Sequence, residues 1–402
     1  MSGAIVVLNA GSSSIKFAAF ACDAGSLELS GRLLHGEIDG AGASARLVAR
    51  DAAGAALQAS GIVDTTDTSE NHEHALRLLF EWLEQQLPEH ELLAIGHRVV
   101  HGGERFVGPV RIDANILERL AALSPLAPLH QPHNLAAIRV IERLQPGLPQ
   151  VASFDTAFHW TLPWVAHTYA LPARLRDAGI RRYGFHGLSY EYIASVLPAH
   201  LGKQADARVV VAHLGNGASL CAMRGRRSVE TTMGFTALDG LMIGTRCGCL
   251  DPGVVMYLQS TLGMSIAQVE HLLYQESGLL GVSGISADMR TLEASDDLNA
   301  EAAIALFVHK ISLELGSLAA ALGGLDALVF TAGIGEHSAA VRARVCTEAS
   351  WLGVDIDDVA NRGHAGRIDS PASRVSVHVI PTDEELMLAR HACDVLAGRT
   401  DA

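Results

Sequence analysis

The stretch Ile5-Val6-Val7-Leu8-Asn9-Ala10-Gly11-Ser12-Ser13-Ser14-Ile15-Lys16-Phe17 joins an apolar run to a turn of small residues and then to a second apolar segment. The same order of features returns far along the chain in Val209-Val210-Val211-Ala212-His213-Leu214-Gly215-Asn216-Gly217-Ala218-Ser219-Leu220. Runs of β-branched residues are typical of buried strands. One supersecondary unit used twice predicts an α/β protein with two similar domains that face each other across a cleft.

Length and composition agree with two domains. The chain has 402 residues, and single hydrophobic cores seldom grow beyond about 250–300 residues. Hydrophobic residues make up 49% of the chain and charged residues 18%, which excludes a disordered or coiled-coil protein. The net charge of −14, without a Lys/Arg-rich block, argues against a dedicated nucleic-acid binder.

Three features favour a cytoplasmic protein that is not inserted in a membrane. The first residues carry no basic segment and only a short apolar run, unlike a signal peptide. The longest charge-free stretch, residues 120–138, is interrupted by prolines and is therefore no membrane span. The six cysteines are scattered through the chain, as reduced thiols are.

Patterning predicts a mixture of strands and helices. Strands are expected at 5–8, 209–211 and 327–330, and helices at 73–87, 135–144 and 301–322. Asn134 is a candidate N-cap of the middle helix. The segment 25–69, rich in small and polar residues, predicts hairpins and exposed turns.

Three turns of small residues follow predicted strands, and each can present backbone N–H groups to an anion. In the first, Lys16 adds a cation and Asn9 offers an oxygen suited to hydrated Mg²⁺. The third, Leu328-Val329-Phe330-Thr331-Ala332-Gly333-Ile334-Gly335-Glu336, has the strand-turn-helix order of phosphate-binding loops but no Walker A sequence. One such loop alone is more often an ordinary hairpin, whereas the set of three favours nucleotide binding.

Charged and imidazole side chains supply candidates for anion chemistry. Arg98 and Arg246 each stand among glycines, which lets a guanidinium reach carboxylate or phosphate oxygens. Either arginine alone could equally lie on the surface, and histidines beside apolar residues are more often structural. Asp155 and Glu384 either cap a helix or turn, or bind Mg²⁺ or an arginine.

Together, eight blocks resemble the acetate kinase family in order, from residue 5 to about 390. They are Asn9-Ala10-Gly11-Ser12-Ser13-Ser14-Ile15-Lys16, Gly96-His97-Arg98-Val99-Val100-His101-Gly102-Gly103, Phe154-Asp155-Thr156-Ala157-Phe158-His159, Tyr183-Gly184-Phe185-His186-Gly187, His213-Leu214-Gly215-Asn216-Gly217, Met233-Gly234-Phe235-Thr236, Gly244-Thr245-Arg246-Cys247-Gly248 and Thr331-Ala332-Gly333-Ile334-Gly335-Glu336. The resemblance implies the reaction ATP + acetate ⇌ ADP + acetyl phosphate. It also implies duplicated ribonuclease H-like domains, as in the acetate and sugar kinase/Hsp70/actin fold, and a homodimer.

The resemblance further implies roles for individual residues. The catalytic positions match Arg98, Asp155, His186 and Arg246, and the acetate-binding positions match Arg98, Val100, Leu129, His130, Phe185 and Ala237. The nucleotide-binding positions match Ser14, Lys16, His213, Leu214, Gly215, Asn216, Gly217, Gly333, Ile334 and Gly335, and the Mg²⁺ or Mn²⁺ positions match Asn9 and Glu384. The expected N-terminal domain spans 1–150 with about 386–402, and the nucleotide-binding domain spans 151–385.

Elementary chemistry is consistent with such a site. A carboxylate is already ionised near pH 7, so it needs no strong base to attack a phosphoryl group. The obstacle is repulsion between anions, which Arg, His and Mg²⁺ offset by positioning and charge. Asp155 is therefore expected to orient an arginine or metal-bound water rather than accept a proton.

Three positions depart from the family pattern. Ala237 stands where proline is common in the family, and the smaller side chain can widen the methyl pocket and admit propionate. One methylene in an apolar pocket changes binding by about 1–3 kcal/mol, so the selectivity between the two acids is expected to be modest. Asp383 and Gln131 each replace a common asparagine, and we expect them to tune metal affinity or loop geometry. The alternatives to an acetate kinase are a propionate or butyrate kinase, a sugar kinase with an aspartate base, and an actin- or Hsp70-like ATP-binding module.

Overall fold

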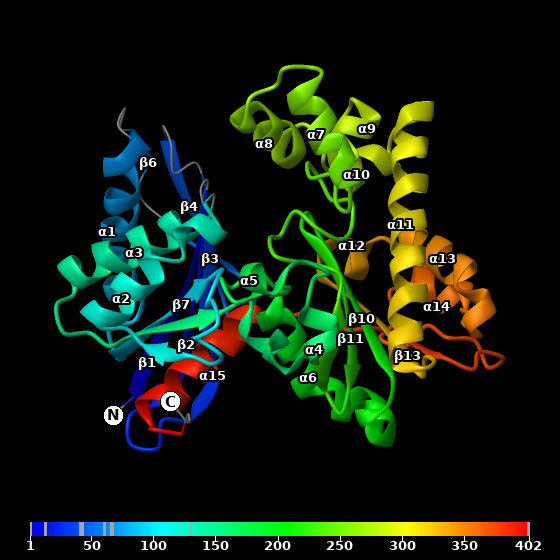
Figure 1. The fold of residues 1–402 in the computed structure, drawn as a ribbon. Helices are drawn as coiled ribbons and strands as arrows, with labels where there is room; N and C mark the ends of the chain where they lie inside the picture. The colour runs from blue at the N-terminus through cyan, green and yellow to red at the C-terminus, as the bar shows by residue number, and fades with distance from the viewer. Residues whose placement is uncertain are drawn as a thin grey trace. The chain divides into compact units, whose positions relative to one another are not determined.

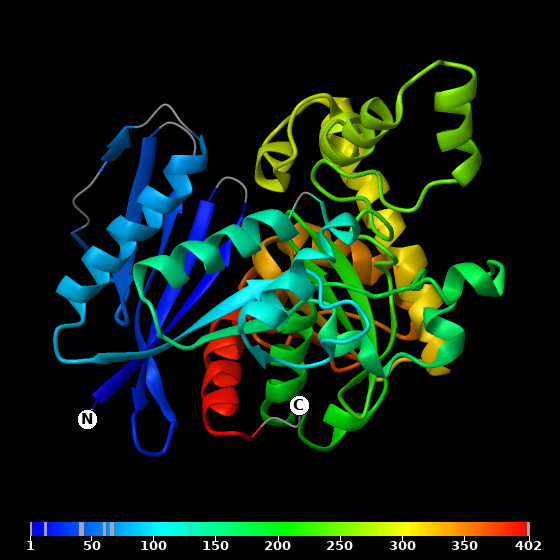
Figure 2. The same cartoon turned by 60° about the vertical axis from the view of Figure 1, so that its left-hand side comes forward.

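The computed structural model of the chain describes residues 2–11, 14–39, 44–58, 62–64, 68–128 and 130–399. The chain divides into two compact units, unit 1 with Met1–Ala157 and Asp383–Ala402, and unit 2 with Phe158–Thr382 (Figure 1). The C-terminal segment thus returns to unit 1, where the red helix α15 packs on β1 and β7 (Figures 1 and 2). Asp155 and Glu384 both belong to unit 1 in this division.

The sheet of unit 1 follows the order β5-β4-β3-β2-β1-β7-β9-β8, with β6 paired to β4. Its strands are β1 (Ser2–Ala10), β2 (Ser14–Asp23), β3 (Leu29–Asp39), β4 (Ser44–Asp51), β5 (Ala56–Leu57), β6 (Ile62–Asp64), β7 (Glu91–Val99), β8 (Val110–Arg111) and β9 (Gln150–Phe154). Strands β1, β2 and β3 pair antiparallel, whereas β1, β7 and β9 pair parallel.

The sheet of unit 2 follows the order β12-β11-β10-β13-β14. Its strands are β10 (Val209–Leu214), β11 (Ala218–Arg224), β12 (Arg227–Thr231), β13 (Ala327–Thr331) and β14 (Ser376–Val379). Three strands pair antiparallel, and β10, β13 and β14 pair parallel. The order and directions repeat those of β3-β2-β1-β7-β9, so the predicted duplication is confirmed, and each unit has the ribonuclease H-like strand order.

Helices flank both sheets. Unit 1 contains α1 (Thr68–Gln86), α2 (Ala114–Ala121), α3 (Gln131–Leu144), α15 (Glu384–Leu396) and the 3-10 turn Ser124–Leu126. Unit 2 contains α4 (Trp164–His167), α5 (Ala173–Arg176), α6 (Gly187–Leu201), α7 (Pro252–Ser260), α8 (Ile266–Gln275), α9 (Gly278–Ser283), α10 (Met289–Glu293), α11 (Leu298–Leu322), α12 (Ala332–His337), α13 (Ala339–Glu348) and α14 (Asp358–Arg362), and the 3-10 turns Ala157–Thr161, Gly202–Asp206 and Ser350–Leu352 lie between its elements.

Helix α11 is the central helix of the unit 2 core. Asp297 caps its first turn through a hydrogen bond from Asn299 N, and Gly323 ends it with a φ of +72°. Its inner face buries Phe307, Ile311 and other apolar side chains against the core that also contains the sheet. By length and composition alone the helix could cross a membrane, but 44% of its most apolar window is buried inside the protein, as in a core helix.

Two local predictions were wrong in instructive ways. Asn134 is not an N-cap, because α3 begins at Gln131 with Pro132 in its first turn. Gly333 and Gly335 do not form a separate turn, because α12 starts directly after β13 and contains both. The abrupt passage from strand to helix places Ala332 at a φ of +64°, a conformation that L-residues seldom adopt. The prediction of hairpins in 25–69 is confirmed, because β3 pairs antiparallel with β4, and β4 pairs antiparallel with β5 and β6.

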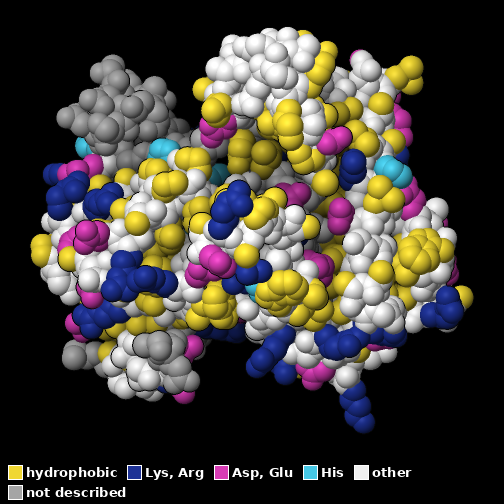
Figure 3. Space-filling view, in the orientation of Figure 1, with side chains coloured by type: hydrophobic (Ala, Val, Ile, Leu, Met, Phe, Trp, Pro, Cys, Tyr) yellow, Lys and Arg dark blue, Asp and Glu magenta, His cyan; other side chains and the backbone are white. Residues whose placement is uncertain are grey.

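Surface charge does not separate into regions of one sign on the face shown in Figure 3. There, basic and acidic side chains lie interspersed among hydrophobic ones. The net charge of −14 is therefore not the property of a single acidic patch on this face.

Candidate active site

The polar candidates of unit 1 lie where three neighbouring strands end. Asn9 is the penultimate residue of β1, Arg98 is the penultimate residue of β7, and Asp155 follows β9 directly. Since these strands run parallel, their carboxyl ends share one edge of the sheet. Ligands of α/β sheets bind at this edge. The sheet thereby brings together side chains that are far apart in the sequence.

Asp155 forms a bidentate ion pair with the guanidinium of Arg98. Arg98 Nε donates to Asp155 Oδ1 at 2.9 Å, and Nη2 donates to Oδ2 at 2.5 Å. The remaining nitrogen, Nη1, donates to Asn9 Oδ1 at 3.3 Å. The Asp155 side chain is 3% exposed, whereas that of Arg98 is 21% exposed. The carboxylate therefore fixes the plane of a guanidinium that still reaches solvent.

Glu384, the first residue of α15, completes this group of charges. Burial raises the pKa of Glu384 to about 7, and the charge of Arg98 opposes that rise. Asp155 and Glu385 raise the pKa further, whereas Lys16 lowers it. Burial alone would lower the pKa of Arg98, but the surrounding carboxylates raise it above its usual value. The group thus combines Arg98, which stays protonated, with Glu384, whose ionised form is disfavoured by its surroundings.

The oxygen donors at this edge fit Mg²⁺. A half-buried carboxylate with a raised pKa beside a second carboxylate is stabilised by a divalent cation, and Asn9 offers an amide oxygen nearby. Within the described ranges, three or more His, Cys, Asp or Glu side chains do not gather into a metal cluster.

Asp383 and Gln131, two departures from the family pattern, have structural partners. Asp383 caps α15 by accepting a hydrogen bond from Leu386 N at 2.9 Å, and it forms an ion pair with Arg32 at 2.6 Å. Gln131 is fully buried, and its amide pairs with both the N–H and the carbonyl of His101. Asp383 thus fixes the start of the helix that carries Glu384, and Gln131 shapes the loop that follows β7.

The expected acetate-binding residues of unit 1 lie beside that loop. Val100 is buried, and its N–H donates to Asn134 Oδ1 at 3.1 Å. Asn134 Nδ2 donates in turn to Ala10 O at 2.7 Å, so one side chain ties the ends of β1 and β7 together. His130 stands at the N-cap position of α3, and Leu129 lies outside the described residues. Asn134 is a site-shaping residue that the sequence suggested only as a helix cap.

The first glycine-serine turn is described only in part. Gly11 N donates to Ser14 O at 2.9 Å and so closes the turn between β1 and β2. Lys16 is exposed and lies opposite Asn9 in the register of these strands. Ser12 and Ser13 lie outside the described residues. Ser14 and Lys16 therefore share the strand-end edge with Asn9.

Two histidines of unit 2 form a stacked pair. His186 precedes α6 with a φ of +58°, and His213 lies in β10. Their ring centroids are 4.2 Å apart at an interplanar angle of 20°. His186 Nδ1 lies 2.8 Å from Ser219 Oγ, and His213 Nδ1 lies 2.8 Å from Ser189 Oγ. The left-handed backbone at His186 is the kind of local strain that persists where surrounding contacts enforce it.

His159 supports the backbone just before His186. Its Nε2 lies 2.9 Å from the carbonyl of Phe185, and its Nδ1 lies 2.8 Å from Ser228 Oγ. The imidazole ring packs so closely on Gly184 that an added Cβ there would lie 2.6 Å from His159 Cδ2. Gly184 also has a φ of +75°. A buried histidine therefore shapes the turn that presents Phe185 and His186.

This arrangement predicts a loss of stability in acid. Burial lowers the pKa of His159 to about 4, whereas an unfolded histidine titrates near 6.5. The unfolded state therefore takes up the proton first as the pH falls, so stability is full above about pH 6.5 and is lost toward pH 4, by about 3 kcal/mol. Urea unfolding from pH 7.5 to 4.5 measures this. His159→Gln, which cannot take up the proton, should show a shallower pH slope, and an unchanged slope would contradict the assignment.

Arg246 is held in a separate loop of unit 2. Its Nη1 donates to the carbonyl of Ala237 at 3.1 Å, and its guanidinium carbon lies 5.9 Å from the ring centroid of Tyr274. Gly278 approaches so closely that an added Cβ would lie 2.8 Å from Arg246 N. Ala237 therefore contacts Arg246 through its backbone. A proline at that position would keep this carbonyl.

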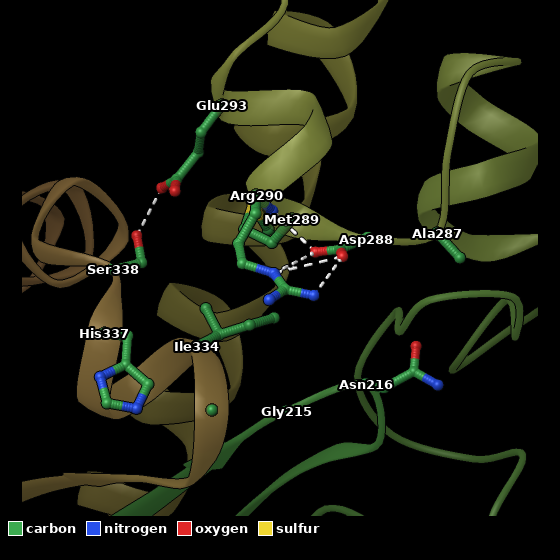
Figure 4. Close-up of a pocket in the computed structure, with 11 residues that line it drawn as sticks. Gly215, Asn216, Ala287, Asp288, Met289, Arg290, Glu293, Ile334, His337 and Ser338 are labelled. Atoms are coloured by element: carbon green, nitrogen blue, oxygen red, sulfur yellow. Dashed lines mark hydrogen bonds and ion pairs between the residues drawn. The ribbon is translucent and has the colours of Figure 1, made fainter. Parts of the chain in front are cut away.

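The loop of Gly215–Gly217 and the start of α12, which contains Gly333, meet at one pocket of unit 2. It has a volume of about 510 Å³, within the range of small-molecule sites. Gly215 and Asn216 line one side, and Gly333, Ile334, His337 and Ser338 line the α12 side (Figure 4). Leu214 and Gly335 are buried just behind these surfaces, and Gly217 closes the first loop by accepting from Gly215 N at 2.9 Å. The structure thus brings together two loops that the sequence singled out separately.

The third wall of the pocket was missed by sequence reasoning. Asp288 caps the short helix α10 and pairs with Arg290 at 2.6 Å, and Glu293 accepts a hydrogen bond from Ser338 Oγ (Figure 4). The signal that could have found this wall is the Asp288 cap after a run of small residues. A cap of this kind is too common in proteins to single out a binding wall.

Comparisons with known proteins agree over the full length. The model of the acetokinase family matches residues 4–390. A protein of Rhodopseudomonas palustris named acetate kinase is 56% identical over 402 residues, covering 99% of this chain and 100% of the relative. The solved structure of a propionate kinase from Francisella tularensis has a TM-score of 0.88 at 38% identity and covers 97% of this chain and 98% of its own. That of an acetate kinase from Porphyromonas gingivalis has a TM-score of 0.84 at 35% identity, with coverages of 98% and 100%.

Proposed function

The chain belongs to the acetokinase family, and from this membership we infer that it is a kinase that transfers the terminal phosphoryl group of ATP to acetate. The reaction is reversible and gives ADP and acetyl phosphate. The observation that carries the inference is the 56% identity with an acetate kinase across practically the whole of both chains. ATP and acetate are accordingly its substrates.

We propose that acetate attacks the terminal phosphorus directly. One carboxylate oxygen forms the new P–O bond while the bond to the bridging oxygen of ADP breaks, and ADP leaves with the electron pair. No proton has to be removed from acetate, because its carboxylate is ionised near pH 7. The residues of this chain therefore act by binding, orienting and offsetting charge.

Arg98 and Arg246 are the proposed anion ligands. Each bears a guanidinium restrained by a neighbour, Asp155 for Arg98 and the Ala237 carbonyl for Arg246. A guanidinium that is already held in place loses less conformational freedom than a mobile one when it binds carboxylate or phosphoryl oxygens. His186 is the proposed hydrogen-bond donor to the phosphoryl group. Asp155 acts by orienting Arg98.

ATP is proposed to bind with its nucleoside in the pocket of unit 2 and its phosphates along the glycine loops. The pocket volume and the presence of Gly215 and Gly333 in its lining support this assignment. His213 and Asn216 border the same loop, and Ser14 and Lys16 are the proposed nucleotide-binding residues of unit 1. Ile334 contributes the apolar contact expected for a nucleoside.

Asn9 and Glu384 are the residues that would hold Mg²⁺, with Mn²⁺ as a substitute. When bound, the ion offsets the negative charge of the phosphate oxygens. The raised pKa of Glu384 supports the assignment, since burial beside Asp155 leaves a site that favours a cation.

The preferred acid is proposed to be acetate, with propionate as the alternative. Val100 follows the strand that carries Arg98, and Phe185 precedes His186; both are buried and apolar. With Leu129, His130 and Ala237 they are the proposed contacts of the methyl group. A propionate kinase is among the similar solved structures, at 38% identity. One methylene changes binding by about 1–3 kcal/mol, so the discrimination is modest.

A cytoplasmic homodimer is the proposed working form. Unit 2 exposes Trp164, Val165 and Met256, at 60%, 77% and 64% of their surfaces, which is consistent with an apolar contact between copies. Light scattering on the purified protein measures the mass that tests this.

The activity test is the formation of acyl phosphate. Protein, ATP and Mg²⁺ are incubated with acetate, propionate, butyrate or glycerol, and acyl phosphate is trapped with hydroxylamine as the hydroxamate. We expect hydroxamate from acetate, a smaller yield from propionate, and ADP release above background only with the acids. Absence of hydroxamate from every acid would refute the proposed function, and ADP release with glycerol alone would indicate a sugar kinase.

A further inference from the structure

We propose that Ser219 and Tyr190 are positioning residues that select one tautomer of His186, so that His186 Nε2 carries the proton offered to the phosphoryl group. The inference rests on the role of His186 proposed above and deepens it. The three residues belong to unit 2, so the argument uses contacts within one compact unit.

The contacts form a short chain of hydrogen bonds. Ser219 Oγ, on β11, lies 2.8 Å from His186 Nδ1. Tyr190 Oη, on α6, lies 2.5 Å from the same Ser219 oxygen. The side chains of Ser219 and Tyr190 are completely buried, so water does not compete for these bonds. Ser219 is therefore placed to connect the phenol with the imidazole.

We assign the direction of the bonds from the phenol. Burial raises the pKa of Tyr190 well above its ordinary value, so the phenol keeps its proton, and we assign that proton to Ser219 Oγ, the oxygen 2.5 Å away. Ser219 then has its own proton to donate, and His186 Nδ1 is the acceptor within reach. A neutral imidazole that accepts at Nδ1 carries its proton at Nε2. The buried pair thus specifies a single tautomer.

The other ring nitrogen faces the nucleotide loop. A Cβ added to Gly217 would lie 3.0 Å from His186 Nε2, which places this atom beside the loop that contains Gly215 and Asn216. Gly215 and Asn216 line the unit 2 pocket. A proton fixed at Nε2 is therefore directed toward the side on which phosphates are proposed to lie.

His213 shows the same arrangement on the second ring of the stack. Thr382 Oγ1 donates to Ser189 Oγ at 2.9 Å, and Ser189 Oγ lies 2.8 Å from His213 Nδ1. Each ring of the pair thus has a hydroxyl at Nδ1, with a second hydroxyl behind it. This repetition supports the inference that the hydroxyl groups set the orientation of both rings. In other functional histidines, a hydrogen bond to the second ring nitrogen likewise fixes the tautomer and the orientation of the ring.

Ser219→Ala tests the proposal. Without its hydroxyl, His186 is no longer held in one tautomer, and we expect kcat to fall about 10- to 100-fold with the KM values for ATP and acetate unchanged. Nitrogen-15 spectra of histidine-labelled protein supply a readout independent of activity, with the His186 signal assigned by its loss in His186→Gln. We expect the protonated-Nε2 form in the wild type and a mixture of tautomers in Ser219→Ala. Tyr190→Phe, which removes the donor to Ser219, should shift both readouts in the same direction.

Ser195→Ala is the matched control, because Ser195 is an exposed serine on the same helix, α6, whose hydroxyl donates to Tyr192 O. It should leave both readouts unchanged. A wild-type kcat in Ser219→Ala, or a lower kcat with an unchanged tautomer, overturns the inference. An active His186→Gln instead overturns the proposed role of His186, so the two failures are distinguishable.

Discussion

Arg98→Lys should lower kcat for acetyl phosphate formation by about 10³-fold, the scale seen when a charge-stabilising arginine is lost in phosphoryl transfer. Lysine keeps the positive charge, so Asp155 is not left as a buried unpaired carboxylate and the fold should persist. It lacks the planar fork, however, and cannot satisfy both carboxylate oxygens while also presenting an N–H to a ligand. Steady-state kinetics with the hydroxamate assay measures the loss, and circular dichroism checks the fold.

The matched control is Arg143→Lys on α3. Arg143 forms a surface ion pair with Glu73, at side-chain exposures of 57% and 36%, so its replacement should leave kcat unchanged. Asp155→Asn should also lower kcat, because it keeps the shape but removes the charge that orients Arg98. If both Arg98→Lys and Asp155→Asn retained near-normal turnover, the anion-ligand role of Arg98 and the orienting role of Asp155 would both be wrong.

The duplication of a strand-turn-strand unit could be predicted from sequence because it rests on local patterns. Apolar runs such as Ile5–Leu8 and Val209–Val211 reappear as β1 and β10, each flanked by strands in the same order. Arg98 could likewise be singled out by the glycines that flank it, although its place at the end of β7 was not predicted. These features depend on a few consecutive residues, so one sequence is enough to suggest them.

Contacts between distant segments could not be predicted in this way. Asn134 looks like a helix cap, yet its side chain ties Val100 to Ala10 across two strand ends. Ser219 reads as one more small residue in a strand, and its position behind His186 depends on how β11 meets α6. Such roles depend on three-dimensional register, which residue type and spacing do not encode.

Arg342 is a second residue whose contacts with distant segments could not be predicted, and we expect these contacts to stabilise the fold strongly. Its side chain is fully buried in α13, and its N–H groups donate to four oxygen acceptors, with His364 as a fifth polar contact. Nε donates to Asn361 Oδ1 at 2.8 Å, and Nη1 donates to the carbonyls of Gly335 and Glu336 at 2.9 and 2.8 Å. Nη2 donates to Asn361 O at 2.9 Å and contacts His364 Nδ1 at 3.1 Å. The guanidinium thereby satisfies carbonyls at the end of α12, which has no further helical turn to do so.

Arg342→Met should therefore reduce the free energy of unfolding by about 3–5 kcal/mol, because methionine fills similar space but leaves several buried carbonyl and amide oxygens without a donor. The KM for ATP should rise more than the KM for acetate, since α12 supplies Gly333 and Ile334 to the pocket.

Urea unfolding followed by tryptophan fluorescence measures the free energy of unfolding. Arg344→Met on the same helix is the control, because Arg344 pairs with Glu301 near the surface and its loss should cost less than about 1 kcal/mol. Equal unfolding midpoints for the two variants would show that Arg342 does not stabilise the end of α12.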